Sequence, residues 1–152
     1  MQLMLHALKP ADAQYYLQHV VAPRPICFAS TIDAAGRVNL SPYSFFNLFS
    51  SAPPVVIFSP ARRVRDNTTK HTLQNVLEVP EVAINIVSYS MVQQTSLASC
   101  EYLKGVDEFV KAGFTKEPAS LIKPPLVKEA PAKLECKVLE VKSLGDGGGA
   151  GQ

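Results

Sequence analysis

The sequence predicts a mainly β protein in which an antiparallel barrel carries a few attached helices. Strand-like segments outnumber helical ones, and the links between strands are short or contain a single helix. Strands and helices do not alternate regularly, and no Gly-x-Gly-x-x-Gly motif follows a strand. These features disfavour a dinucleotide-binding fold built on a parallel sheet.

The first elements follow from apolar runs separated by a turn. Residues 1–18 read as a short lead-in, and residues 20–32 read as a strand with prolines near its start, as at a strand entrance. Asp-Ala-Ala-Gly at 33–36 is a turn signal between strands. The sequence therefore predicts a hairpin whose second strand is residues 37–43.

The middle of the chain predicts one further strand and one helix. Residues 44–50 are expected to curl into a helical turn, and residues 55–59 form a strand that is apolar on both faces. Such a strand is expected to be fully buried. Asn67 has the side chain of a helix N-cap, so a helix is expected to run from there to about Glu78.

In the last third of the chain, segments with a clear strand or helix pattern are separated by a segment without one. Residues 82–87 predict another buried strand, and Ser90 with Gln93 has the spacing of a capping box for a following helix. Residues 101–131 contain many glycines and prolines and are expected to be irregular. Residues 132–144 alternate apolar and polar positions, which predicts a long strand.

Composition limits the classes of protein. The chain has 152 residues and 47% apolar residues, which suits one globular domain over residues 1–152. A net charge of +2 argues against a general nucleic-acid binder. The cations are unevenly placed, however, and four lie close together: Arg62, Arg63, Arg65 and Lys70.

The cysteine and hydropathy patterns indicate in which cellular compartment the protein is expected. The three cysteines are scattered and form no Cys-x-x-Cys pair, so we expect reduced thiols and no metal site. No apolar run reaches the roughly 20 residues of a membrane span, and a secretory signal is not evident. The expectation is a cytoplasmic protein that does not bind membranes.

A polar loop followed by a basic one is the strongest functional signal. Ser41, Ser44 and Asn47 offer short hydrogen-bonding side chains, and the basic cluster follows the next strand. This pattern suits a flat polar ring that carries a phosphate, because forked guanidinium donors and free amides near a helix start bind anions. The alternative interpretations are a turn of small polar residues and a solvated basic loop.

Several motifs occur in one order: Pro-Arg-Pro-Ile-Cys-Phe-Ala-Ser-Thr at 23–31, Asn-Leu-Ser-Pro-Tyr-Ser-Phe-Phe-Asn at 39–47, Pro-Pro at 53–54 and Lys-His-Thr at 70–72. In this order the sequence resembles the flavin reductase-like, FMN-binding split-barrel family, in its flavoredoxin-type branch. The resemblance implies a six-stranded antiparallel Greek-key barrel that usually forms a homodimer, with FMN near the subunit interface. Family members usually continue past the glycine-rich turn, so a closing strand is expected to be missing from this chain.

The resemblance also implies site residues. The loop from Ser41 to Ser44 and Asn47 would follow the flavin ring and ribityl chain. The phosphate would lie near Ser59, Arg62, Arg63, Lys70 and Thr72. The family often has Asp where this chain has His71, which leaves the role of that position open. The full set of expected cofactor-binding residues is Ser41, Pro42, Tyr43, Ser44, Asn47, Ser59, Arg62, Arg63, Lys70 and Thr72.

The function implied is transfer of reducing equivalents from NADH or NADPH to flavin or a small acceptor. Because FMN carries the redox chemistry, no catalytic side chain is expected. Two alternatives stay open. One is a flavin-carrying electron-transfer protein without NAD(P)H activity of its own, and the other is a non-enzymatic barrel that binds a different phosphorylated ligand.

Overall fold

The computed structural model describes residues 2–152. Its helices are the 3-10 turns η1 (Leu5–Ala7) and η2 (Tyr89–Met91) and the α-helices α1 (Pro10–Val20), α2 (His71–Glu78), α3 (Val92–Ala98) and α4 (Glu108–Ala112). Its strands are β1 (Cys27–Ile32), β2 (Val38–Tyr43), β3 (Phe46–Ser51), β4 (Pro54–Phe58), β5 (Glu81–Ile86), β6 (Lys116–Glu117), β7 (Leu126–Val127) and β8 (Lys133–Lys137). Among these helices none is long and apolar enough to cross a membrane.

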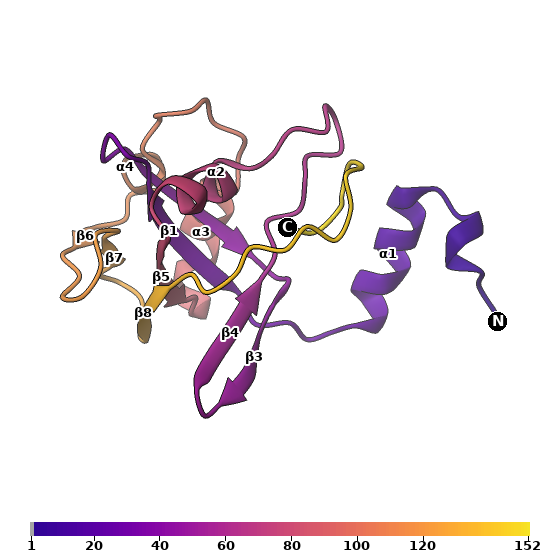
Figure 1. The fold of residues 1–152 in the computed structure, drawn as a ribbon, viewed down its shortest axis with the longest axis horizontal. Helices are drawn as coiled ribbons and strands as arrows, with labels where there is room; N and C mark the ends of the chain where they lie inside the picture. The colour runs from indigo at the N-terminus through magenta and orange to yellow at the C-terminus, as the bar shows by residue number, and fades with distance from the viewer. Residues whose placement is uncertain (1) are drawn as a thin grey trace.

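A four-stranded antiparallel sheet in the order β2-β1-β5-β8 forms the centre of the molecule (Figure 1). Every residue of β1 is buried, because β1 has a strand on each side and packed side chains on both faces. The predicted turn between β1 and β2 is confirmed. Gly36 adopts φ 77° there and donates its amide to the Asp33 carbonyl at 2.9 Å.

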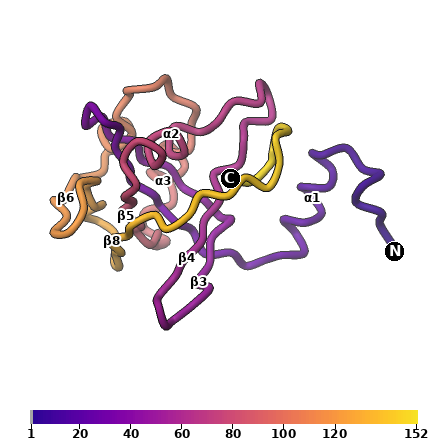
Figure 2. Tube along the Cα trace, viewed as in Figure 1, coloured from indigo at the N-terminus to yellow at the C-terminus, as the bar shows by residue number. Residues whose placement is uncertain are grey.

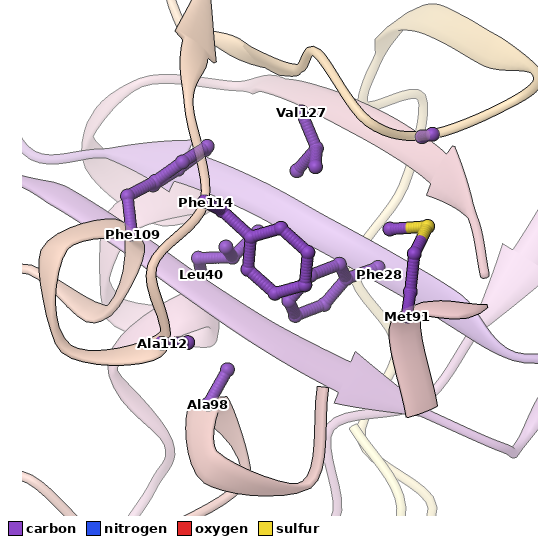
Figure 3. Packing of buried hydrophobic residues seen from close by; sticks show 9 residues of the cluster. Phe28, Leu40, Met91, Ala98, Phe109, Ala112, Phe114 and Val127 are labelled. Atoms are coloured by element: carbon purple, nitrogen blue, oxygen red, sulfur yellow. The ribbon is translucent and has the colours of Figure 1, made fainter. Parts of the chain in front are cut away.

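One face of the sheet packs against α3, α4 and the segment that follows them (Figure 3). The rings of Phe28 and Phe114 meet edge to face at 5.2 Å between centroids. The buried cluster on this face consists of Phe28, Leu40, Met91, Ala98, Phe109, Ala112, Phe114, Val127 and Ala130. Burial of these side chains holds the second half of the chain against the sheet.

The opposite face is covered by α2 and by one side of the β3–β4 hairpin. Its buried members are Cys27, Ala29, Tyr43, Leu73, Val76, Val82 and Ile84. Phe46, Val56 and Phe58 of the hairpin pack against this cluster. Cys27 and Ala29 lie on this face while Phe28 lies on the other, as the alternation of a strand requires.

Helix α1 and the β3–β4 hairpin leave apolar side chains exposed to solvent. Helix α1 buries none of its residues and stands apart from the sheet (Figures 1 and 2). The β3–β4 hairpin exposes Leu48, Phe49 and Ile57. Among residues 2–152 these two elements therefore have apolar surface that the chain itself does not cover.

The expected barrel appears only in part. The antiparallel pairing and the attached helices are confirmed, but the strands of residues 2–152 form three separate sheets and no closed barrel. The β3–β4 hairpin pairs only with itself, and the same holds for β6 and β7.

Several expected elements are wrong in the first half of the chain. The stretch expected as a helical turn, 44–50, is mostly strand β3, because it finds a pairing partner in β4. Strand β4 is not fully buried, since the hairpin covers the core with one side and Ile57 is 50% exposed. Asn67 does not cap α2: it adopts a left-handed φ of 55° in the preceding loop, and the helix starts at His71.

The second half also needs corrections. The helix expected after Ser90 is present as α3, but Ser90 makes no capping bond and belongs to the 3-10 turn. The stretch expected to be irregular, 101–131, contains α4, β6 and β7. The strand expected over 132–144 ends at Lys137, because that residue pairs with Glu81, the first residue of β5.

Candidate functional site

A polar hollow lies where the end of β2 meets the start of α2. Asn39, Ser41 and Tyr43 alternate along β2 and therefore present their side chains on the same face of the sheet. The hollow is open to solvent, and its cavity volume is about 30 Å³, room for about two water molecules. Its lining residues are Asn39, Ser41, Tyr43, Arg63, Lys70, His71, Thr72, Ala98, Ser99, Cys100, Glu101, Tyr102 and Glu108.

A hydrogen-bond network joins the strand to the helix at the base of the hollow. The Thr72 Oγ1 atom lies 2.7 Å from the Tyr43 hydroxyl and accepts a bond from Asn39 Nδ2 at 2.9 Å. Burial raises the pKa of Tyr43 to about 12, against the opposing effect of its hydrogen bonds to Thr72 and Ser41. Tyr43 is therefore a neutral hydroxyl at physiological pH, able to donate or accept a hydrogen bond.

Positive charge gathers at one end of the hollow. The Arg63 guanidinium is 12% exposed and donates to Thr68 Oγ1 at 3.0 Å and to the Thr69 carbonyl oxygen. Glu101 lies 3.6 Å from Arg63 Nε and 3.9 Å from Lys70 Nζ. Burial lowers the pKa of Lys70 and the Arg63 charge lowers it further, whereas Glu101 acts in the opposite direction.

The other two arginines of the basic cluster lie outside the hollow. Arg65 is 72% exposed and pairs with Asp66 and Glu101, each at 3.1 Å. Arg62 donates from Nε to Asn67 Oδ1 at 2.8 Å, so its guanidinium is engaged within the loop. The structure thus separates Arg63, which lines the hollow, from its two neighbours.

The remaining expected residues are dispersed around this centre. Pro42 pairs with Phe28 inside the sheet. Ser44 accepts a bond from Arg24 Nε at 3.3 Å. Asn47 lies exposed on the hairpin, and its side chain accepts from the Leu48 amide at 2.8 Å. The Ser59 hydroxyl accepts from the Gln152 amide at 3.1 Å. Of the ten expected residues, the hollow therefore brings together Ser41, Tyr43, Arg63, Lys70 and Thr72.

A second, smaller hollow adjoins the first and contains residues that the sequence did not single out. Its cavity volume is about 10 Å³, and it shares three residues with the first hollow: Asn39, His71 and Glu108. Glu108 is buried, and its Oε2 atom accepts from the Leu40 amide at 3.0 Å. Burial raises the pKa of Glu108, although the bond from Leu40 lowers it.

His71 lies between the two hollows. Burial lowers its pKa, and the cations Arg63, Lys104 and Lys70 lower it further. The imidazole is therefore biased toward its neutral form. The sequence does signal the start of α4, because Asp107 caps this helix through a 3.1 Å bond from the Phe109 amide, but this signal does not extend to the position of Glu108 in the site.

The arrangement favours an anionic ligand with hydrogen-bonding edges. Hydroxyl and amide groups line the base of the larger hollow, and two cations stand at one end of it. Within residues 2–152, no group of three or more histidines, cysteines or carboxylates is arranged to hold a metal ion.

Sequence comparison matches residues 20–148 to the model of the flavin reductase-like domain. A protein of uncharacterised function from Aquifex aeolicus is 41% identical over 119 residues, covering 78% of this chain and 60% of its own length. Another, from Halalkalibacterium halodurans, is 33% identical over 149 residues, covering 98% of this chain and 71% of its own length. The chain thus spans less than two thirds of one of these relatives and 71% of the other.

Structural comparison gives the same grouping. Nitrilotriacetate monooxygenase component B from Bacillus cereus superposes with a TM-score of 0.92 at 25% identity, covering 99% of this chain and 75% of that one. A protein from Shewanella frigidimarina, described as a candidate flavin reductase with a split-barrel domain, gives a TM-score of 0.80 at 25% identity, covering 100% of this chain and 78% of that one.

Proposed function

The chain belongs to the family of flavin reductase-like domains, and from this premise we propose that it is an FMN-binding oxidoreductase that uses NADH or NADPH. In this proposal it passes reducing equivalents to flavin or to a small acceptor. One observation carries the proposal: a single hollow combines the hydroxyl groups of Ser41, Tyr43 and Thr72 with the cations Arg63 and Lys70.

The residues present fit the chemical groups of FMN. Hydroxyl side chains suit the carbonyl and nitrogen edges of the flavin ring, and Arg63 with Lys70 suits its phosphate. Bound FMN supplies the hydride and electron chemistry. The protein's part is to bind and orient the flavin, with Thr72 holding the Tyr43 hydroxyl at the base of the hollow.

The other expected residues enter the proposal in two ways. Pro42, Ser44 and Asn47 are proposed flavin contacts on the family resemblance alone. Ser59 and Arg62 belong to the loop that carries Arg63, and they support the phosphate end through that loop.

We also propose that the protein is a homodimer with the flavin near the interface. The β3–β4 hairpin exposes Leu48, Phe49 and Ile57, which are 61%, 65% and 50% accessible. Helix α1 has 11 residues and buries none, and isolated helices of that length are marginal in water. A second copy of the chain that packs on the hairpin and on α1 would bury the exposed apolar side chains and stabilise the helix.

The test is a ligand titration followed by reduction. FMN added to the purified protein should raise the melting temperature, because a ligand present at about 100 times its Kd stabilises the folded state by about 2.7 kcal/mol. Anaerobic mixing of the FMN complex with NADH, and separately with NADPH, should then bleach the oxidised flavin band. A protein that shows neither a thermal shift nor fluorescence quenching with FMN contradicts the proposal.

The same experiment separates the alternatives. Binding of FMN without bleaching by either nucleotide would indicate an electron carrier that is reduced by another protein. Binding of other phosphorylated compounds in preference to FMN would indicate a non-enzymatic ligand-binding domain.

A further inference from the structure

The glycine-rich segment 145–151 lies along the loop that carries Arg63. In the Cα trace the yellow segment runs beside the loop that precedes α2 (Figures 1 and 2). The two are joined through the backbone of Arg62: its amide donates to the Ala150 carbonyl at 2.9 Å, and its carbonyl accepts from the Gly149 amide at 3.0 Å. Residues far apart in the sequence therefore form one paired unit next to the cationic end of the hollow.

Side-chain contacts reinforce this pairing at both ends of the loop. Asn67 Nδ2 donates to the Asp146 carbonyl at 2.8 Å, and the Gln152 amide donates to Ser59 Oγ at 3.1 Å. Asn67 also accepts from Arg62 Nε. The loop is thus attached to the C-terminal segment on both sides of Arg63, at Ser59 and Arg62 before it and at Asn67 after it.

Two glycines allow the close approach. A Cβ atom on Gly151 would lie 2.7 Å from Ser59 Oγ, closer than such atoms come in proteins. A Cβ on Gly148 would lie 3.1 Å from the Val64 Cα and 3.4 Å from the Arg63 carbonyl oxygen. Gly147 differs, since its Cβ would meet nothing within 4 Å. These three glycines have no left-handed φ, so alanine would change space and not backbone strain.

Arg63 depends on this loop for its direction. Its amide donates to the Thr68 carbonyl and its carbonyl accepts from the Asn67 amide, both at 2.9 Å. Its guanidinium is then fixed by Thr68, Thr69 and Glu101 at the edge of the hollow. A shift of the backbone at residues 62–64 would move the guanidinium relative to Lys70, which comes from the separate start of α2.

We propose that Gly148 and Gly151 are positioning residues for recognition of the flavin phosphate: they let the glycine-rich segment fix the loop so that Arg63 and Lys70 converge on one anion. This inference rests on the proposed function. It predicts that these glycines govern preference for a phosphorylated flavin over its unphosphorylated form. In this role the two glycines contact neither the ligand nor the Arg63 guanidinium. They allow the close approach in which Gly149 and Ala150 bond to the backbone of Arg62.

The test compares FMN with riboflavin in the full chain. Gly148→Ala and Gly151→Ala should each raise the Kd for FMN by about tenfold, the cost of a lost hydrogen bond to a charged group. The Kd for riboflavin should change by less than about twofold, because the phosphate is its only difference from FMN. Gly147→Ala is the matched control in the same segment and should leave both constants unchanged.

Asn67→Gly provides a second route that adds no bulk. Glycine accepts the left-handed φ of 55°, while the side-chain bonds from Arg62 Nε and to the Asp146 carbonyl are lost. The bond from Arg62 Nη2 to the backbone carbonyl of residue 67 remains. The variant should also lower the preference for FMN over riboflavin. If the alanine variants do not fold, the ratio of the two dissociation constants in Asn67→Gly alone tests the proposal.

Two outcomes overturn the inference while leaving the proposed function intact. One is that both dissociation constants stay unchanged in Gly151→Ala and Asn67→Gly, and the other is an equal loss of FMN and riboflavin binding, which would indicate general damage. A wild-type protein that binds no FMN overturns the proposed function and this inference with it.

Discussion

The Tyr43 hydroxyl lies 2.7 Å from Thr72 Oγ1 and so connects the last residue of β2 to the first turn of α2. Both side chains are buried, and Asn39 donates to the same threonine oxygen at 2.9 Å. Because Lys70 directly precedes this helix, the contact also fixes where a cation stands relative to the strand. The polar base and the charged end of the hollow are therefore parts of one network.

Replacing Tyr43 with phenylalanine tests this network. The change removes one buried hydroxyl and leaves Thr72 with its bond from Asn39, so the free energy of unfolding should fall by about 1 kcal/mol near neutral pH. Urea unfolding of the two proteins measures the difference. No loss of stability would mean that the Tyr43–Thr72 contact contributes nothing to the fold.

The same pair of proteins should show a specific dependence on pH. The pKa of Tyr43 rises from 10.0 in the unfolded chain to about 12 in the fold. Between these values the unfolded chain has released a proton that the folded chain keeps, so the stability of wild type falls as pH rises. The advantage of wild type over Tyr43→Phe should shrink by about 1 kcal/mol between pH ~10 and pH ~11. A constant difference across that range would contradict the raised pKa.

Glu108→Gln should stabilise the protein at neutral pH. Burial raises the pKa of Glu108 above 4.5, so the folded state binds more protons than the unfolded state and wild type loses stability as pH rises through the interval between the two values. Glutamine keeps an oxygen for the Leu40 amide and carries no charge to bury. The variant should gain on wild type as pH increases, and the gain should vanish in acid. Glu140→Gln, at an exposed position, is the control for denaturant unfolding at several pH values.

Arg63→Met should weaken FMN binding much more than Arg65→Met. Arg63 lines the hollow and is 12% exposed, whereas Arg65 is 72% exposed and points to Asp66 and Glu101. Loss of a charge-assisted bond to phosphate should raise the Kd for FMN by about 10- to 100-fold. Fluorescence titration with FMN, and with riboflavin as the ligand control, measures the effect. Equal losses in the two variants would show that the basic loop acts as a diffuse charge.

The exposed side of the hairpin should determine the oligomeric state. Phe49→Asp with Ile57→Asp places charge where the proposed partner copy packs, so a dimer should become a monomer. Size-exclusion chromatography with light scattering measures the mass. Leu121→Asp is the control, since Leu121 is 79% exposed in the β6–β7 connection, away from the hairpin. A double variant that remains dimeric would place the interface elsewhere.

Local chemistry predicted the central sheet well. Strands β1, β2 and β5 follow from apolar runs and a turn in which Asp33 and Gly36 have side chains suited to their backbone. The prediction failed where long-range pairing decided the outcome. Residues 46–51 became a strand because β4 lies beside them, and β8 ended where β5 offered no further partner.

The site was predictable in part for a similar reason. Side chains in short sequence motifs, such as Ser41, Tyr43 and Lys70, lie together because β2 and α2 meet. Asn67 was assigned a capping role because asparagine suits both helix N-caps and left-handed loops, and only the path of the loop distinguishes them. Glu108 comes from a helix far along the chain, so no local pattern places it beneath the Leu40 amide.

Glu101 contacts three cations, Arg63, Lys70 and Arg65, at 3.6, 3.9 and 3.1 Å. These positive groups consequently already have a counter-ion before any ligand arrives. A phosphate that binds there would replace the Glu101 carboxylate as the counter-ion of these side chains, instead of neutralising cations that have no partner. Its binding should therefore weaken less with added salt than the number of basic side chains alone suggests.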